Sequence, residues 1–146
     1  MRGELNETAR LNVALVGLRL ILGIVFVAHG AQKLFGWFGG SGINGTGEFF
    51  AGLGLTPGVP LAALSGAGEL VGGLLMLVGV LIPLGALILT IDMLVAIGWR
   101  TSKLGFISGG GVELNLLILM IVLALVLLGP GRYSLDWLTR RPGRPL

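Results

Sequence analysis

Four long apolar runs constrain what this chain of 146 residues can fold into. Hydrophobic residues make up 54% of the sequence and charged residues only 12%, whereas a soluble domain carries about 25% charge. A chain this apolar cannot be disordered, and as a soluble monomer it would expose large apolar patches. The sequence therefore predicts one small integral membrane domain over residues 1–146.

The apolar runs predict four transmembrane helices, because each is close to the ~20 residues that cross a bilayer. We expect them at about residues 13–35, 60–81, 84–99 and 112–128. Pro60 suits a first helical turn, Pro83 marks a tight turn, and Gly129-Pro130-Gly131 stops the last helix. The expected fold class is an all-α, antiparallel four-helix bundle in the membrane, with a basic C-terminal tail over residues 132–146.

A Gly-rich connection over residues 36–59 separates the first span from the second. Within it, residues 46–53 are expected to form a short amphipathic helix with Thr46 as its N-cap. Four aromatic residues of the connection suit the membrane–water boundary: Trp37, Phe38, Phe49 and Phe50. We therefore expect this segment to lie on the bilayer surface.

Basic residues flank the spans unevenly. Four spans place both termini on one side, where six arginines lie near the membrane: Arg2, Arg10, Arg132, Arg140, Arg141 and Arg144. The other side carries Lys33 and, in a polar loop over residues 100–111, Arg100 and Lys103. The positive-inside rule then predicts that both termini are cytoplasmic. We expect the net charge of +3 to set this topology beside lipid head groups rather than to bind nucleic acid.

Ionisable residues within the spans are the candidates for function, because a charge at the bilayer centre costs about 2.5–3.5 kcal/mol. Five of them lie inside or at the mouth of the spans: His29, Lys33, Glu69, Asp92 and Glu113. A rise of ~1.5 Å per residue places all five in the non-cytoplasmic half, with every span contributing, and Arg19 alone in the inner half. We therefore expect one polar pocket, able to hold a quinone head group, a small polar ligand or a proton path.

Helical periodicity supports a shared interior for the first span. Arg19, His29 and Lys33 fall within an arc of about 80°, and His29 and Lys33 are an i, i+4 pair. Structural interpretations remain open beside the functional one. Arg19 could extend to lipid phosphate, and His29 could be a core residue whose hydrogen bonds are satisfied.

The carboxylates also allow structural interpretations. Lys33 with Glu69 or Asp92 could form an ion pair that fixes helix register, and Glu113 could lie at a helix N-terminus, where the dipole favours a carboxylate. A metal ion held by these carboxylates and His29 is conceivable, but we expect no metal site. Gly68-x-x-x-Gly72 is expected to let helices approach closely.

The residue inventory limits redox chemistry within the chain. Without Cys, disulfides, thiol exchange and iron–sulfur clusters are excluded, and a single His cannot supply both axial ligands of a bis-histidine haem. The repeated Glu-x-x-His of di-iron bundles is absent. The Gly runs at residues 39–42 and 109–111 lack the Lys-Ser/Thr pair of a nucleotide loop. We expect no haem, flavin or iron–sulfur cluster bound by this chain alone.

Several short motifs follow one another along the chain in an order that matches a known family. They are Arg19-x-x-Leu22-Gly23-x-x-Phe26-x-x-His29-Gly30-x-x-Lys33, Thr46-x-x-Phe49-Phe50, Gly54-Leu55-x-Pro57, Gly66-x-x-Glu69-x-x-Gly72-Gly73, Asp92-Met93-x-x-Ala96 and Gly129-Pro130-Gly131-x-Tyr133-Ser134-Leu135-Asp136. Together they cover roughly residues 15–138 and resemble the DoxX family of small bacterial membrane proteins. The resemblance implies a four-span protein of the bacterial cytoplasmic (inner) membrane.

The resemblance also implies a redox setting. Family members are described as subunits of a terminal quinol oxidase or a thiosulfate–quinone oxidoreductase, and others as membrane organisers for partner proteins. We therefore expect an accessory subunit of a quinone-linked oxidoreductase that is not catalytic alone, with a non-catalytic scaffold for partner proteins as the alternative. The expected partners are the lipid bilayer and either further copies of the chain or other subunits. A solute carrier is a third candidate, although inverted repeats are not visible.

Under the quinone hypothesis, each candidate residue has a role. Lys33 or His29 would hydrogen-bond a quinone carbonyl, and Glu69 or Asp92 would exchange the proton. Glu113 is a further ligand-binding candidate, while Arg19, Gly68 and Gly72 are expected to be structural. Substituting Glu69 and His29 together should then abolish quinone binding.

Overall fold

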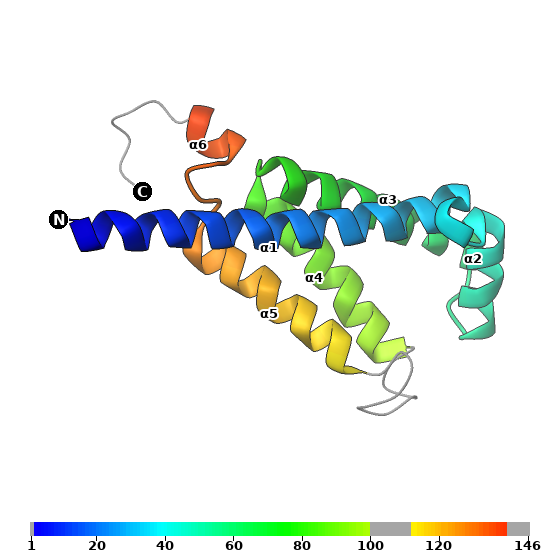
Figure 1. The fold of residues 1–146 in the computed structure, drawn as a ribbon. Helices are drawn as coiled ribbons and strands as arrows, with labels where there is room; N and C mark the ends of the chain where they lie inside the picture. Colours follow the sequence, from blue (N-terminus) through cyan, green and yellow to red (C-terminus); the bar gives the residue numbers. More distant parts are fainter. Residues whose placement is uncertain (1, 100–111, 140–146) are drawn as a thin grey trace.

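The computed structural model describes residues 2–99 and 112–139, in which all regular structure is helical (Figure 1). Its elements are α1 (Arg2–Phe35), the 3-10 helix η1 (Trp37–Gly39), α2 (Gly42–Gly52), α3 (Gly58–Val78), α4 (Ile82–Trp99), α5 (Val112–Leu128) and α6 (Leu135–Thr139). The expected polar loop over residues 100–111, with Arg100 and Lys103, lies outside the described residues, as do Arg140, Arg141 and Arg144.

The helices form the expected membrane bundle. Three of them, α1, α3 and α4, are long and apolar enough to cross a bilayer, and α5 is a shorter apolar helix of 17 residues. Seventeen residues rise about 26 Å, near the lower limit for a span. Successive long helices alternate in direction, and α6 lies at the same end of the bundle as the start of α1 (Figure 1).

The turn between α3 and α4 begins at Gly79, four residues before Pro83, where the sequence predicted it. Gly79 adopts φ 73° and donates its N–H to the carbonyl of Leu75 at 2.9 Å, and the N–H of Val80 donates to the same carbonyl. This left-handed cap is strongly favoured by glycine. Pro83 therefore lies in the first turn of α4, where its missing N–H leaves no bond unmade.

The short helix of the Gly-rich connection is confirmed, but the expectation that Thr46 caps it was wrong. Helix α2 begins at Gly42, so Thr46 lies in its second turn. The Thr46 side chain is buried, and its Oγ1 donates to the carbonyl of Lys33 at 3.5 Å. The hydroxyl therefore joins α2 to the end of α1 instead of satisfying an N–H of its own helix.

Helices α1 and α3 pack closely because glycines face each other along their contact. A Cβ atom added at Gly30 would lie 2.7 Å from the carbonyl oxygen of Gly66, and one at Gly23 would lie 2.8 Å from that of Gly73. The Gly68-x-x-x-Gly72 pair faces α4 instead, since a Cβ atom at Gly72 would lie 2.7 Å from Leu89. Small residues thus bring backbones together within this chain, as expected for helices in lipid.

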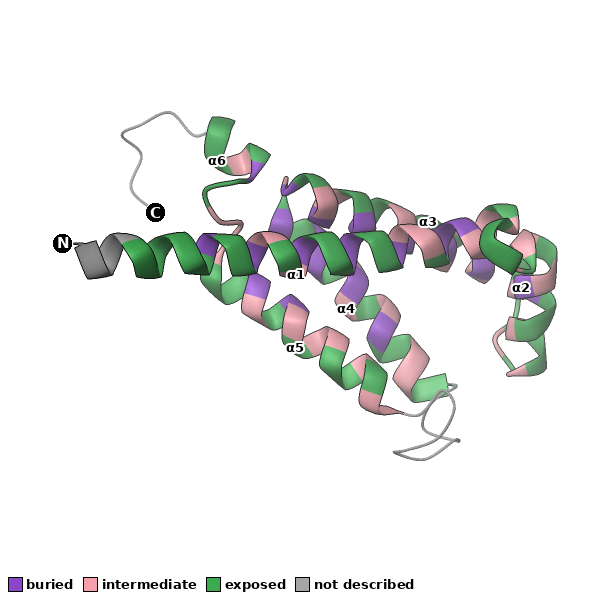
Figure 2. Ribbon diagram, viewed as in Figure 1, coloured by how far each residue is buried: buried purple, intermediate pink, exposed green. Residues whose placement is uncertain are grey.

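The apolar core lies in the half of the bundle near α6. Its members come from all four long helices: Leu15, Leu22, Phe26, Met76, Ile82, Ala86, Leu89, Met93, Val122 and Leu125. Toward the α2 end, α4 and α5 diverge from α1 (Figure 1), and buried residues become fewer along α5 (Figure 2). The bundle is therefore tightly packed at one end and opened at the other.

Arg19 holds the packed end together. It is only 3% exposed, and its guanidinium donates to the carbonyl of Pro130 and, at 3.0 Å, to that of Tyr133. A Cβ atom at Gly79 would lie 2.7 Å from Arg19 Cζ, so the guanidinium also lies against the cap of α3. The alternative in which Arg19 extends to lipid phosphate was wrong, because the buried guanidinium binds carbonyls of the segment that follows α5.

Candidate functional site

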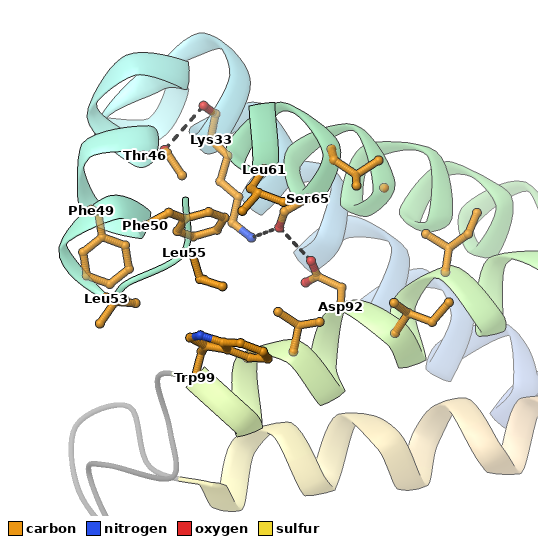
Figure 3. Close-up of a pocket in the computed structure, with 16 residues that line it drawn as sticks. Lys33, Thr46, Phe49, Phe50, Leu53, Leu55, Leu61, Ser65, Asp92 and Trp99 are labelled. Atoms are coloured by element: carbon orange, nitrogen blue, oxygen red, sulfur yellow. Dashed lines mark hydrogen bonds between the residues drawn. The ribbon is translucent and has the colours of Figure 1, made fainter. Parts of the chain in front are cut away.

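A pocket of about 480 Å³ lies at the opened end of the bundle, between α2, α3 and α4 (Figure 3). Most of its lining is apolar: Phe49, Phe50, Leu53, Leu55, Leu61, Leu64, Ile88, Ile91, Val95, Ala96 and Trp99. Leu64 and Ile91 are 71% and 54% exposed, so the pocket opens sideways between α3 and α4, toward lipid in a membrane. Its shape and lining suit a molecule with an apolar tail.

The polar part of the pocket is a short chain of hydrogen bonds across three helices. Lys33 of α1 donates from Nζ to Oγ of Ser65 on α3 at 2.8 Å. Ser65 in turn donates to Oδ1 of Asp92 on α4 at 2.6 Å. The three side chains point into the pocket (Figure 3), so it presents a cationic donor beside an anionic acceptor.

Glu69 lies behind this chain of hydrogen bonds and does not line the pocket. Its Oε1 pairs with Lys33 Nζ at 2.9 Å, and its side chain is only 4% exposed. Its Oε2 is buried without a hydrogen-bond partner among the described residues. The cluster thus has one cation for two carboxylates, Glu69 and Asp92.

Helix α2 holds Lys33 in place from the other side. The Phe50 ring centroid lies 5.9 Å from Lys33 Nζ, a cation–π distance, and Thr46 binds the Lys33 carbonyl. Ser65 and Glu69 take two of the three ammonium donors. The third N–H has no further hydrogen-bond partner within the described part of the chain, so it is available to a ligand.

His29 does not join this cluster, contrary to the expectation of a shared pocket. It is exposed, does not line the pocket, and its Nδ1 lies 2.9 Å from the carbonyl oxygen of Val25 on its own helix. The buried face of α1 is centred near Arg19, and at ~100° per residue His29 lies about 80° away from it. The arc of about 80° on α1 that holds Arg19, His29 and Lys33 is therefore wider than the face of α1 that α3 covers, and His29 lies outside that face.

Glu113 also lies apart from the pocket. It occupies the first turn of α5 and is half-buried, with an Oε2 that has no partner among the described residues. The structure therefore brings together three of the five candidates, Lys33, Glu69 and Asp92, from three helices rather than four. Within residues 2–99 and 112–139, no group of three or more His, Asp or Glu side chains is placed to hold a metal ion.

Sequence reasoning missed Ser65, which connects Lys33 to Asp92. The signal was present, because Ser65 precedes Glu69 by four residues and therefore shares its face of α3. A serine within an apolar helix is common, so only a neighbouring charged pair would single it out. Phe50 was expected at the bilayer surface, but it also packs against Lys33.

Comparison with known proteins identifies the family. The DoxX family model matches residues 14–102. The chain is 32% identical over 136 residues to the uncharacterized membrane protein Rv3486 of Mycobacterium tuberculosis. This match covers 84% of this chain and 79% of the relative. It is 33% identical over 119 residues to a Bacillus subtilis protein named Putative oxidoreductase CatD, covering 82% and 81% of the two chains. No solved structure is significantly similar. The chain therefore belongs to the DoxX family.

Proposed function

We propose that this protein is an accessory subunit of a quinone-linked membrane oxidoreductase and binds the head group of a quinone in the pocket between α2, α3 and α4. The observation that carries the proposal is the combination of an apolar pocket open to lipid with a donor–acceptor pair, Lys33 and Asp92, at its polar end. The name of the Bacillus subtilis relative, an oxidoreductase, supports a redox setting.

The residues fit such a ligand in two respects. The apolar lining matches an aromatic ring with an alkyl tail, and the exposed side chains of Leu64 and Ile91 mark an exit for the tail between α3 and α4. The third N–H of Lys33, which has no hydrogen-bond partner among the described residues, would donate to a ring oxygen, and Asp92 would accept from a ring hydroxyl. When bound, a quinone would supply the electron-carrying chemistry that this Cys-free chain lacks.

The chain's own residues would orient the head group and handle its proton. Ser65 fixes the spacing between Lys33 and Asp92, since its hydroxyl binds both. Phe50 and Trp99 would exclude water from the polar end. Asp92 is the carboxylate in the pocket lining, so it would exchange a proton with the ligand, and Glu69 would exchange one with Asp92 from behind.

The scaffold alternative predicts a different arrangement. If the ionisable residues only fixed helix register, they would close into ion pairs with no cavity beside them. Lys33 and Glu69 do form such a pair, but Lys33 also lines a pocket of about 480 Å³ together with Asp92. The open pocket is the feature that favours ligand binding over a purely structural role.

Quenching of tryptophan fluorescence provides a direct test, because Trp99 lines the pocket and quinones quench nearby indoles. The variant W37F/W137F leaves Trp99 as the single reporter among the three tryptophans. Titration of this variant in detergent with decylubiquinone should give saturable quenching. In the same background, Asp92→Asn should lower the affinity obtained from the titration by about tenfold, because one charge-assisted hydrogen bond to the ligand is lost.

Glu113→Gln is the matched control, because it removes a carboxylate that does not line the pocket. It should leave the titration unchanged. Quenching that never saturates, or that Asp92→Asn and Glu113→Gln affect equally, would reject the quinone site and favour the scaffold. Mass spectrometry of the gently purified protein would show independently whether a quinone accompanies it.

A further inference from the structure

Helix α1 has a second polar surface beside the one that carries Lys33, and its residues do not line the pocket. His29 is exposed, Gln32 is half-buried, and the neighbouring Val25 is 38% exposed. Helix α5 diverges from α1 toward this level (Figure 1). We call the surface formed by Val25, His29 and Gln32 the α1 outer face.

The hydrogen bond of His29 determines what this side chain offers to its surroundings. A carbonyl oxygen only accepts, so the Nδ1 atom must carry the proton that it shares with Val25 at 2.9 Å. In the neutral imidazole, Nε2 is then an unprotonated acceptor. Because Nδ1 bonds the backbone of its own helix, Nε2 is the ring nitrogen that remains for a group outside α1.

An acceptor at this depth needs a donor. His29 lies six residues before the end of α1, or about 9 Å along the helix axis, and so within the span. The hydrocarbon interior contains no water to satisfy it, and an unmatched polar group there is costly. Polar side chains on a lipid-facing surface therefore indicate contact with another helix.

The same face carries a suitable donor. Gln32 uses one N–H of its side-chain amide to bind the carbonyl of Phe38 at 3.3 Å, which leaves the second N–H for another acceptor. Gln32 follows His29 by three residues on the same face, so donor and acceptor differ in depth by about 4.5 Å, a distance that the two side chains can span. A surface with both groups is complementary to itself, which is what a two-fold interface requires.

We propose that the α1 outer face is the contact between two copies of this chain in the membrane, where Gln32 of each copy donates to His29 Nε2 of the other. Two symmetric hydrogen bonds then satisfy both imidazoles. The inference is independent of the proposed quinone site, because neither residue lines that pocket.

Disulfide cross-linking tests the contact, since the natural chain contains no cysteine. Val25→Cys in the full-length protein, oxidised in native membranes, should give a dimer of twice the chain mass. Leu87→Cys is the matched control: it is 57% exposed on α4 and at a similar depth. Cross-linking of Val25→Cys no faster than Leu87→Cys, or an adduct that contains a different protein, would overturn the proposal.

The hydrogen bonds are tested in the V25C background. His29→Leu and Gln32→Leu should each slow cross-linking by about threefold for every interhelical bond lost, so by nearly tenfold for the symmetric pair. Combining them should add little, because both changes remove the same two bonds. Cross-linking that is insensitive to both substitutions would overturn the pairing of Gln32 with His29.

Discussion

Lys33 Nζ lies 2.9 Å from Glu69 Oε1, and this ion pair joins α1 to α3 at the point where the bundle opens. The two partners differ in their surroundings: the Lys33 side chain is 22% exposed and that of Glu69 only 4%. Lys33 therefore faces both the carboxylate and the pocket. The same ammonium group contributes to the stability of the bundle and to the binding surface, and these two contributions can be separated by substitution.

Lys33→Met should destabilise the protein, because it leaves the Glu69 carboxylate buried without its cation. The loss should be somewhat less than the ~3–5 kcal/mol of a fully buried pair, since Lys33 is partly exposed. The double variant K33M/E69L should recover most of that loss, because apolar side chains suit this environment. Thermal unfolding in detergent, followed by circular dichroism, measures both. A double variant as unstable as the single one would contradict this account.

Ser65→Ala should weaken ligand binding with little effect on stability. The hydroxyl accepts from Lys33 and donates to Asp92, so its removal leaves the donor and the acceptor unconnected. We expect the affinity for decylubiquinone to fall about tenfold. Ser41→Ala is the control, because Ser41 is exposed beside α2 and makes no side-chain cap bond. Unchanged affinity in the Ser65 variant would show that the spacing of Lys33 and Asp92 does not depend on this hydroxyl.

The fold was largely predictable because length and hydropathy dominate the behaviour of a chain in lipid. The apolar run at residues 112–128 corresponds to the observed α5, and Gly129 ends it with φ 79°. The site was predictable only in part. Depth along each helix indicated that Lys33, Glu69 and Asp92 lie at one level, but depth does not determine which way a side chain points.

His29 and Arg19 illustrate the limit of periodicity. Both were placed on one polar arc of α1, yet Arg19 is buried and His29 is exposed. The width of the buried face depends on how closely α3 approaches and on where α5 diverges. Those quantities are set by glycine contacts between helices and by the packing of the core, and neither is visible in the period of a single helix.

Gly30→Ala should destabilise the α1–α3 contact, because the added Cβ would lie 2.7 Å from the backbone of Gly66 and Leu70. Backbone atoms cannot move aside as a flexible side chain can, so we expect a loss of about 1–3 kcal/mol. Gly17→Ala on the same helix is the matched control, with no atom within 4 Å of the added carbon. It should be neutral or slightly stabilising. Equal melting temperatures for the two variants would contradict the close approach at Gly30.

Arg19→Gln should loosen the packed end of the bundle and release the segment that follows α5. The guanidinium donates to the carbonyls of Pro130 and Tyr133, which lie 111 and 114 residues further along the chain. A hydrogen bond from a charged donor contributes about 1.5–3 kcal/mol, and the shorter neutral amide cannot reach both carbonyls. Asn12 gives this segment a second attachment, since its Oδ1 accepts from the N–H of Arg132 at 2.7 Å.

Limited proteolysis in detergent measures the release, because Arg132 becomes a trypsin site once the segment detaches. We expect cleavage after Arg132 to accelerate at least tenfold in Arg19→Gln, in line with the loss of one charged hydrogen bond. Arg10→Gln is the control, as Arg10 is an exposed arginine of the same helix. Arg19→Lys should give an intermediate rate, because an ammonium keeps the charge but not the two-pronged geometry. If Arg19→Gln and Arg10→Gln were cut at the same rate, the attachment of this segment would have to rest on Asn12 and α6 alone.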